Sequence, residues 1–145
     1  MVKILFKKFD KNIKLPTYKT SGSSGVDLVA HTKYKIIINP GKTAMIPTGI
    51  AVAIPKNYEM QIRPRSGLAA KNGISVLNTP GTIDSDYRGE IKIILINLSK
   101  KTFIVKSGDR VAQMVLCPIA KSIFKQVINL PKTVRGKGGF GSTGK

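Results

Sequence analysis

The chain has 145 residues, of which 25 are lysine or arginine and seven are aspartate or glutamate, giving a formal charge of +18. The length suits one domain with a substantial hydrophobic core. The single cysteine excludes an internal disulfide, and one cysteine with one histidine cannot complete a structural zinc site. No apolar run approaches the roughly 20 residues of a membrane helix. The apolar stretch near Met1 is too short for a signal peptide. We therefore expect a cytoplasmic protein with no membrane association.

A charge of this size is typical of nucleic-acid-binding proteins. The twenty lysines, however, are scattered without a basic block of five or more residues. The arginines all lie in or near glycine-containing or acidic motifs: Arg63, Arg65, Arg88, Arg110 and Arg135. We interpret the lysines as solvated surface charge and the arginines as positions that need a planar bidentate donor. Nucleic-acid binding is possible from the charge but is not the expected function.

Short β-branched segments bounded by Gly, Pro, Asn or Asp dominate the chain, and they are typical of strands. In chain order they include residues 34–39, 49–54, 91–97, 102–105 and 111–116. Only residues 66–73 indicate a helix, with Ser66 as its predicted N-cap and Gly73 at its far end. About ten short strands predict an all-β fold, a distorted jelly roll or β-barrel with one short helix.

The strand pattern stops near Pro131. We expect a β-barrel domain over residues 1–131 and a mobile Gly-rich C-terminal arm over residues 132–145. Five of the last eleven residues are glycine, whose backbone N–H groups can form an anion-binding nest. Ser142 and Thr143 add hydroxyl donors, Arg135 adds a permanent charge, and Phe140 offers a ring on which a base can stack. The alternative is a disordered tail without a ligand.

The few acidic residues cluster in turn-like contexts. Asp109 in Gly-Asp-Arg is explained by capping of a turn, whereas the carboxylate of Asp84 lies in a predicted hairpin from which it can reach a ligand. A second anion-binding element is the segment 63–67, where Arg65 offers a planar fork and Ser66 and Gly67 offer a hydroxyl and N–H groups at a helix start. Together with Gln113, Arg135 and Asp27, these groups predict a polyphosphate cradle that uses Mg²⁺.

Five motifs in order carry a family resemblance, and they span residues 25 to 143: Gly25-Val-Asp-Leu28, Arg63-Pro-Arg-Ser-Gly-Leu-Ala69, Asn78 through Gly89, Gly108-Asp-Arg-Val-Ala-Gln113, and Arg135 through Thr143. The chain resembles the homotrimeric dUTPases, which cleave dUTP to dUMP and pyrophosphate. That reaction limits uracil incorporation into DNA and supplies dUMP for thymidylate synthesis.

The resemblance implies a role for each motif. Asp84 is the general base that orients the attacking water, and Asp27 holds the waters of Mg²⁺. The phosphate chain is bound by Arg65, Ser66, Gly67, Gln113 and Arg135, with Gly141, Ser142 and Thr143 of the arm wrapping the terminal phosphate. Arg88 is expected to be structural, pairing with an acid across a subunit interface.

Uracil recognition is assigned by the same resemblance to a hairpin over residues 78–89. Asn78 offers both a donor and an acceptor, backbone groups near Ile83 and Tyr87 complete the recognition, and the Tyr87 ring packs on the deoxyribose and excludes a 2′-hydroxyl. Phe140 stacks over the base when the arm closes as a lid. The implied assembly is a homotrimer whose active sites are shared between subunits.

Two alternatives stay open at this point. A dCTP deaminase shares the implied fold, but its catalytic region matches this chain poorly. A basic β-barrel that binds single-stranded nucleic acid needs several exposed aromatic residues on a sheet face, and here Tyr34 and Phe103 are expected in the core.

Overall fold

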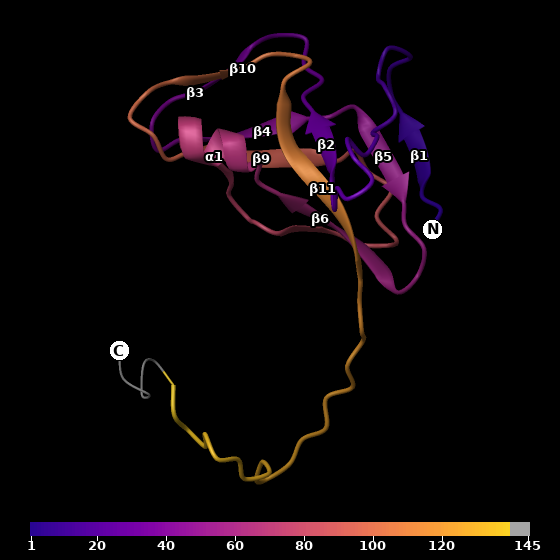
Figure 1. Ribbon diagram of the computed structural model, residues 1–145, viewed down its shortest axis with the longest axis vertical. Helices are drawn as coiled ribbons and strands as arrows, with labels where there is room; N and C mark the ends of the chain where they lie inside the picture. The colour runs from indigo at the N-terminus through magenta and orange to yellow at the C-terminus, as the bar shows by residue number, and fades with distance from the viewer. Residues whose placement is uncertain (140–145) are drawn as a thin grey trace.

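The computed structural model describes residues 1–139 as a β-rich body followed by an extended arm (Figure 1). That part of the chain contains eleven strands and one helix. In order they are β1 (Leu5–Lys8), β2 (Val26–Val29), β3 (Ile36–Ile38), β4 (Thr43–Pro47), β5 (Ile50–Ala53), β6 (Tyr58–Arg63), α1 (Ser66–Asn72), β7 (Ile74–Val76), β8 (Gly81–Ile83), β9 (Lys92–Asn97), β10 (Phe103–Val105) and β11 (Arg110–Pro118). No helix among these residues is long and apolar enough to cross a membrane.

The strands form four small antiparallel sheets. The larger two have the orders β2-β11-β6-β8 and β4-β9-β7, and the pairs β1-β5 and β3-β10 flank them. The predicted all-β jelly-roll class is confirmed, although the strands do not close into one continuous hydrogen-bonded barrel. The core fills the space enclosed by the sheets, with Leu28, Ile46, Ile93 and Leu95 almost completely buried.

Alternation within single strands sets which side chains enter this core. Along β9, Ile93, Leu95 and Asn97 are buried while Lys92 points outward, as the twofold period of a strand requires. Asn97 is buried without loss because its amide is paired at both ends. Its Nδ2 donates to the carbonyl of Ile38 at 2.8 Å, and its Oδ1 accepts the Ser99 N–H at 2.9 Å.

The one helix begins where the sequence predicted, but its N-cap is different. Arg65, and not Ser66, occupies the N-cap with extended backbone angles, and no side chain caps the helix. The Arg65 side chain instead turns toward β2, where it donates to Asp27. At the other end Gly73 adopts φ 64° and its N–H bonds to the carbonyls of Leu68 and Ala69, which confirms the predicted glycine C-cap.

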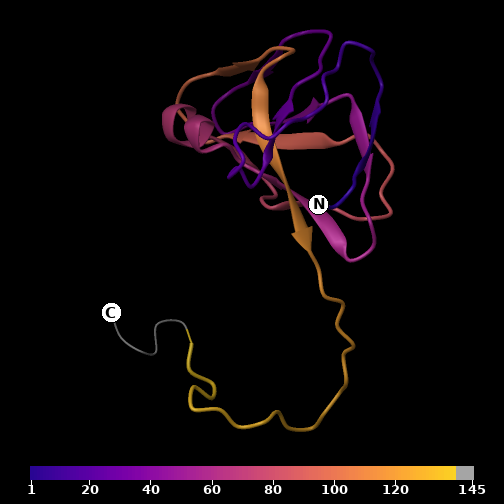
Figure 2. The ribbon, with the colours of Figure 1, turned by 45° about the vertical axis from the view of Figure 1, so that its right-hand side comes forward.

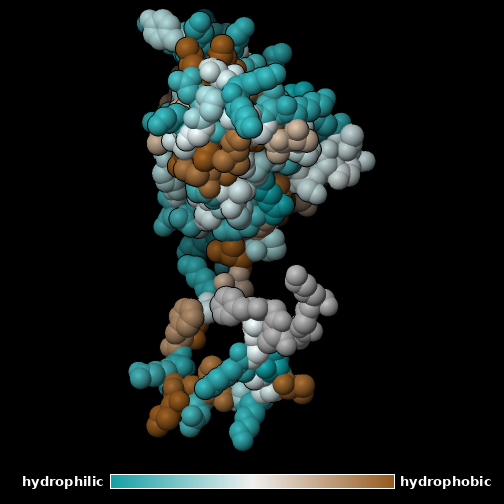
Figure 3. Space-filling view, turned by 90° about the vertical axis from the view of Figure 1, so that its left-hand side faces the viewer, coloured by the Kyte–Doolittle hydropathy of each residue, from teal (hydrophilic) through white to brown (hydrophobic). Residues whose placement is uncertain are grey.

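The arm leaves the body where β11 ends at Pro118 (Figures 1 and 2). Up to residue 139 it runs as an extended segment that stands clear of the sheets in both views. Several of its apolar side chains are almost fully exposed, with Ile123 at 98%, Phe124 at 96% and Ile128 at 99%, and Figure 3 shows brown hydrophobic patches among teal hydrophilic residues below the body. An arm this apolar is typical of a segment that packs against another molecule.

Of the two aromatic residues expected in the core, one lies outside it. Tyr34 is exposed, with the Lys33 ammonium 5.4 Å from its ring centre, so its predicted core position is wrong. Phe103 is partly buried and packs against the core. The loop between Ala30 and β3 places Tyr34 outside the strand pattern, and the alternation that buries Ile38 does not reach it.

Candidate active site

The first half of the candidate site is built around the Asp27 carboxylate on β2. Its Oδ1 accepts a hydrogen bond from Arg65 Nε at 3.0 Å, and its Oδ2 accepts one from Arg110 Nη1 at 3.2 Å. Arg65 Nη1 also donates to the Arg110 carbonyl at 3.0 Å. The sheet brings these residues together because β2 and β6 both pair with β11. Asp27 and Arg65 are largely buried, with 19% and 24% of their side chains exposed.

Gln113 lies beside this cluster at the centre of the same sheet. It stands opposite Asp27 on one side and Arg63 on the other, and its Nε2 donates to the Pro64 carbonyl at 3.0 Å. Gly25 makes this position possible, because a Cβ on Gly25 would lie 2.9 Å from the Gln113 Oε1 and 3.2 Å from the Met114 carbonyl. The first motif therefore needs a glycine for the close approach of β2 to Gln113.

The cluster is suited to a phosphate group. Two guanidinium groups surround one carboxylate, so it keeps a net positive charge, and each guanidinium offers five N–H donors of which the internal bonds use only some. Ser66 and Gly67 follow Arg65 directly and are exposed at the start of α1. Anionic oxygens can therefore approach Arg65 and Ser66 from solvent.

The residues at this cluster also decide how a metal ion could bind. Within residues 1–139 no group of three or more His, Cys, Asp or Glu side chains could hold one. A carboxylate has about four lone-pair positions, and those of Asp27 that the two arginines leave free can accept hydrogen bonds from metal-bound water. Asp27 thus fits an outer role toward Mg²⁺, an ion that usually keeps several waters.

The second half of the candidate site is a cavity of about 350 Å³ beside β8 and β9. Ile83, Asp84 and Tyr87 line it, together with Met45, Thr82, Glu90, Lys92 and Ile94. Asp84 and Tyr87 are both exposed to solvent. A turn in which the Tyr87 N–H bonds to the Asp84 carbonyl at 3.1 Å holds these two residues close together. Its apolar walls, one aromatic ring and a few polar groups, among them the carboxylates of Asp84 and Glu90, suit a nucleoside.

Residues 78–89 do not form the predicted hairpin. Only Gly81–Ile83 is a strand, and it pairs with β6, with Ile62 opposite Gly81 and Met60 opposite Ile83. Asn78 lies in the turn before β8, where its Nδ2 would be 3.2 Å from a Cβ on Gly81. Asn78 is therefore close to the strand that leads to Asp84 but does not line the 350 Å³ cavity.

One chain does not bring the two halves together. Across the sheet Asp27 stands opposite Gln113, Gln113 stands opposite Arg63, and the β6–β8 register continued by one residue puts Pro80 opposite Arg63. Asp84 lies four residues beyond Pro80. Asp84 is therefore displaced from Asp27 by three strand spacings across the sheet and by four residues along the strand direction. These displacements together correspond to roughly 15–20 Å. Arg135 is apart from both, because its Nε donates to the Gly138 carbonyl within the arm at 2.8 Å. Phe140, Gly141, Ser142 and Thr143 lie outside the described residues.

Sequence reasoning missed Arg110 as a member of the Asp27 cluster. Asp27 and Arg110 are 83 positions apart, and only the pairing of β2 with β11 makes them neighbours. The available signal was that all the arginines of a lysine-rich chain fall in motifs. Arg88 donates to the carbonyls of Ser85 and Tyr87, both at 2.7 Å, and forms no ion pair among residues 1–139.

Comparisons with known proteins agree on one family. The dUTPase family model matches residues 11–144. A deoxyuridine 5′-triphosphate nucleotidohydrolase of Rickettsia canadensis is 58% identical over 90% of this chain and 88% of that protein. Among solved structures, the dUTPase of Staphylococcus bacteriophage 80alpha with dUpNHpp has a TM-score of 0.87 at 26% identity, covering 99% of both chains.

A second solved structure is similar in fold. The dUTPase of phage phi11 of S. aureus, described with a structural Mg(II) ion, has a TM-score of 0.80 at 22% identity over 90% of this chain and 99% of that one. The motif order, the guanidinium cluster around Asp27, the nucleoside-sized cavity and a family match that spans nearly the whole sequence agree with one another. This chain belongs to the dUTPase family.

Proposed function

We propose that this chain hydrolyses dUTP to dUMP and pyrophosphate, with Asp84 as the general base. The observation that carries this is the cavity that combines Asp84 and Tyr87 with apolar walls, together with the separate guanidinium cluster around Asp27. A relative 58% identical to this chain is named for this reaction, and the phage 80alpha dUTPase binds dUpNHpp. Removal of dUTP limits uracil incorporation into DNA and supplies dUMP for thymidylate synthesis, and we place this reaction in the cytoplasm.

The phosphate chain is assigned to the first half of the site. Arg65 supplies the guanidinium fork, Ser66 and Gly67 supply exposed donors at the start of α1, and Gln113 stands beside them. Mg²⁺, held by the phosphates and through water by Asp27, would neutralise charge on the phosphate oxygens. The protein's own contribution is positioning and electrostatic stabilisation, the main source of rate in phosphoryl transfer.

Asp84 acts on the attacking water. Its carboxylate accepts a proton as the water oxygen forms a bond to the α-phosphorus, and the bond between that phosphorus and the oxygen bridging to the β-phosphorus breaks. Pyrophosphate leaves with the electron pair of the broken bond. Asp84 forms no ion pair within residues 1–139, so its oxygens are free to hold a water in line with the leaving group.

Base and sugar specificity are assigned to the second half. Asn78 and backbone groups near Ile83 recognise uracil, and the Tyr87 ring packs on the deoxyribose where a 2′-hydroxyl would collide. Phe140 stacks on the uracil from the arm. A cytosine presents a donor where uracil presents an acceptor, which leaves buried groups unpaired and discriminates strongly.

We also propose a homotrimer whose active sites are completed by more than one subunit. Within one chain the two halves are separated by roughly 15–20 Å of sheet, and the arm stands away from both. Fully burying a side chain such as Ile123, Phe124 or Ile128 contributes about 1.5–3 kcal/mol each, which favours docking of the arm on a neighbouring copy. In this assembly residues 119–131 of the arm pack on a neighbouring barrel, so that residues 1–131 make up the barrel domain of the trimer, and residues 132–145, with Arg135, Gly141, Ser142 and Thr143, form the lid.

The activity is tested by pyrophosphate release with Mg²⁺ from dUTP, dTTP, dCTP and UTP, comparing wild type with Asp84→Asn. We expect strong preference for dUTP and a loss of about 100-fold or more in kcat for Asp84→Asn, since general-base catalysis contributes about 10²–10⁴-fold. Ammonia release from dCTP would instead indicate a deaminase. No pyrophosphate from any nucleotide would refute the proposed activity.

Shared sites are tested by complementation. Asp84→Asn and a chain truncated after Lys132 are each expected to be inactive alone. After unfolding and refolding together, mixed trimers should recover part of the activity, because an intact Asp84 and an intact arm can meet at one site. Absence of recovery, with mixed trimers confirmed by native mass spectrometry, would contradict sharing.

A further inference from the structure

The loop that carries Asp84 and Tyr87 is fastened at its base to the turn between β4 and β5. Three hydrogen bonds make this attachment. The Gly49 N–H donates to Glu90 Oε1 at 2.8 Å, the Thr48 hydroxyl donates to the Ile91 carbonyl at 2.5 Å, and the Ile91 N–H donates to the Ile50 carbonyl at 2.8 Å. Thr48 and Ile91 are almost completely buried, so the two bonds made by Ile91 are protected from water.

Glu90 bonds in two directions at once. Its carboxylate, 26% exposed, accepts the Gly49 N–H and has Lys92 Nζ at 3.9 Å. Its backbone carbonyl accepts the Tyr87 hydroxyl at 2.9 Å. One residue therefore joins the Tyr87 ring to the body of the protein. Glu90 also lines the same cavity as Asp84 and Tyr87.

Gly89 leaves the space in which the Tyr87 ring lies. A Cβ on Gly89 would be 2.5 Å from Tyr87 Cζ and 3.0 Å from Cε2, closer than real contacts allow. The ring must therefore lie directly over the Gly89 backbone for its hydroxyl to reach the Glu90 carbonyl. The ring position is thus set by a glycine beneath it and by a hydrogen bond at its tip.

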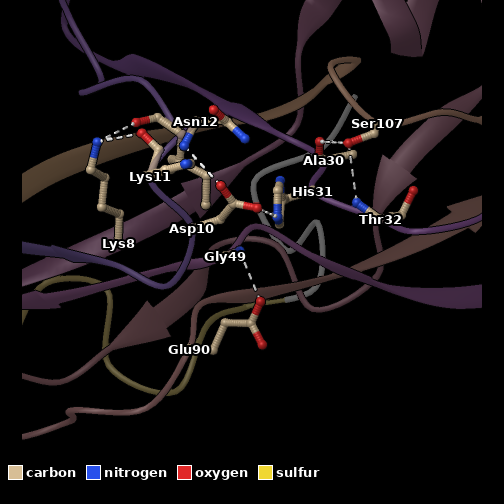
Figure 4. A network of polar contacts seen from close by, with 11 residues as sticks. Lys8, Asp10, Lys11, Asn12, Ala30, His31, Thr32, Gly49, Glu90 and Ser107 are labelled. Carbon is tan, nitrogen blue, oxygen red and sulfur yellow. Dashed lines mark hydrogen bonds and ion pairs between the residues drawn. The ribbon is translucent and has the colours of Figure 1, made fainter.

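The turn whose Gly49 N–H binds Glu90 also contacts the N-terminal segment and His31 (Figure 4). Gly49 has φ 67°, its carbonyl accepts the Phe9 N–H at 2.9 Å, and a Cβ on it would be 2.9 Å from the His31 ring. His31 Nε2 lies 3.5 Å from Asp10 Oδ2. Figure 4 shows the Asp10–His31 contact on one side of Gly49 and Glu90 on the other. The position of Glu90 is therefore fixed by the folded N-terminal segment as well as by its own loop.

We infer that Glu90 is a positioning residue for substrate selection, holding the Tyr87 ring at the sugar side of the cavity through Gly49. This rests on the proposed function, which places the deoxyribose against Tyr87. Loss of the Glu90 carboxylate removes one of the three bonds at the base of the loop and loosens the Glu90 backbone that holds the Tyr87 hydroxyl, and the ring then excludes a 2′-hydroxyl less well. Glu90 touches no reacting atom in this account, so it changes which sugar is accepted more than the chemical step.

The test compares Glu90→Ala, Glu90→Gln and Gly89→Ala with a matched control, Glu59→Ala. Glu59 is, like Glu90, a half-buried glutamate whose carboxylate accepts one hydrogen bond, here from Gln61 Nε2 at 2.7 Å; it lies in β6 and lines none of the cavities named above. Two quantities are measured for each protein: the ratio of kcat/KM for dUTP to that for UTP, and hydrogen exchange of residues 84–91 without nucleotide.

For Glu90→Ala we expect the dUTP/UTP ratio to fall about tenfold, because a misplacement on the order of 1 Å is enough for losses of up to ~100-fold, and exchange of residues 84–91 to accelerate. Glu90→Gln retains an oxygen for the Gly49 N–H and should stay within about threefold of wild type. Gly89→Ala should lower the ratio without accelerating exchange at residue 91, since it moves the ring and leaves the attachment. Glu59→Ala should leave both quantities unchanged.

Unchanged selectivity and exchange in Glu90→Ala would overturn the inference. So would a fall in kcat for dUTP and UTP together that leaves their ratio constant, since that is the result of a purely structural role. Should wild type release no pyrophosphate from dUTP, the proposed function fails on its own. The exchange measurement then tests separately whether the Glu90–Gly49 bond holds the loop. Protection of residues 84–91 that is lost in Glu90→Ala and kept in Glu90→Gln supports this attachment, and equal protection in both variants refutes it.

Discussion

Replacing Gly49 by alanine tests whether the turn between β4 and β5 is fixed by its surroundings. Gly49 has φ 67°, and a Cβ there would meet the His31 ring at 2.9 Å and also the Ile13 side chain. Gly41 supplies a matched control, because its φ is 70° but an added Cβ would have nothing within 4 Å. Both replacements impose the same left-handed backbone on alanine, so the difference between them isolates the contact with His31 and Ile13.

The magnitudes follow from these contacts. A left-handed alanine is destabilising by about 1–2 kcal/mol, partly offset by the lower entropy of its unfolded chain, so Gly41→Ala should lower the free energy of unfolding by about 1 kcal/mol. Overpacking adds about 1–3 kcal/mol at Gly49. The Ile13 side chain can swing aside, whereas the His31 ring is restrained by Asp10 at 3.5 Å and by its own backbone bond to Pro47 at 2.8 Å.

Thermal unfolding at one fixed protein concentration measures the difference. At about 3 °C per kcal/mol for a chain of this size, Gly41→Ala should lower Tm by about 3 °C and Gly49→Ala by about 6–12 °C. A double variant that adds His31→Ala to Gly49→Ala should recover part of the extra loss relative to His31→Ala alone. Equal shifts for the two glycine replacements would refute the claim that His31 and Ile13 confine the turn.

Three further predictions concern the site and the arm. Asp27→Asn should lower the free energy of unfolding by about 1–2 kcal/mol, because its two guanidinium partners lose their shared counter-ion, and should raise KM for dUTP; calorimetry and pyrophosphate release measure these. Gly25→Ala should displace Gln113 and destabilise the sheet by about 1–3 kcal/mol, and a Tm equal to wild type would contradict the close approach. Phe124→Ser combined with Ile128→Ser should shift the protein from trimer toward monomer in light scattering, and an unchanged mass would show that these side chains do not hold the assembly.

Much of the fold could be predicted from local sequence because strand formation here follows local pattern. The predicted segments 34–39, 49–54, 91–97 and 102–105 contain β3, β5, β9 and β10 in turn, and segment 111–116 lies within β11. β-Branched runs bounded by turn residues need no knowledge of their partners to be recognised. The same is true of the helix end at Gly73, since a glycine after a short helical run supplies its own left-handed cap.

Local sequence does not show which strands pair with each other, and the wrong predictions come from such long-range contacts. Residues 78–89 carry turn residues on both sides of a short apolar run, a pattern that two pairing schemes satisfy equally. The structure pairs β8 with β6 and leaves residues 84–90 as a loop. The N-cap error has a similar cause, because Arg65 is drawn into an extended conformation by a carboxylate 38 positions earlier, and local helix signals do not contain that contact.

The residue types of the site were predictable from the sequence, but which of these residues lie next to one another was predictable only in part. Asp27, Arg65 and Gln113 were predicted in one cradle, and the structure places them in contact or on neighbouring strands. Arg110 was missed because its bond to Asp27 depends on a pairing over 83 positions. The roles of Asp84, Asn78 and the arm residues stay predictions, to be decided by the variants described above.

The separation of the two carboxylates within one chain has a chemical consequence. Asp27 is paired with two guanidinium groups, so it acts as their counter-ion and fixes their orientation before any ligand arrives. Both Asp27 oxygens already accept hydrogen bonds from these guanidinium groups, so neither is left as a free oxygen for an attacking water. Asp84, roughly 15–20 Å away by the strand geometry, has no such partner within residues 1–139. If a second subunit brings Asp84 to the cradle only around a nucleotide, the phosphates compete for the guanidinium groups and the base stays free. Assembly from separate chains then keeps the Asp84 carboxylate from forming an ion pair with the guanidinium groups of Arg65 and Arg110. A site built within one chain would need burial or additional acidic residues to prevent that ion pair.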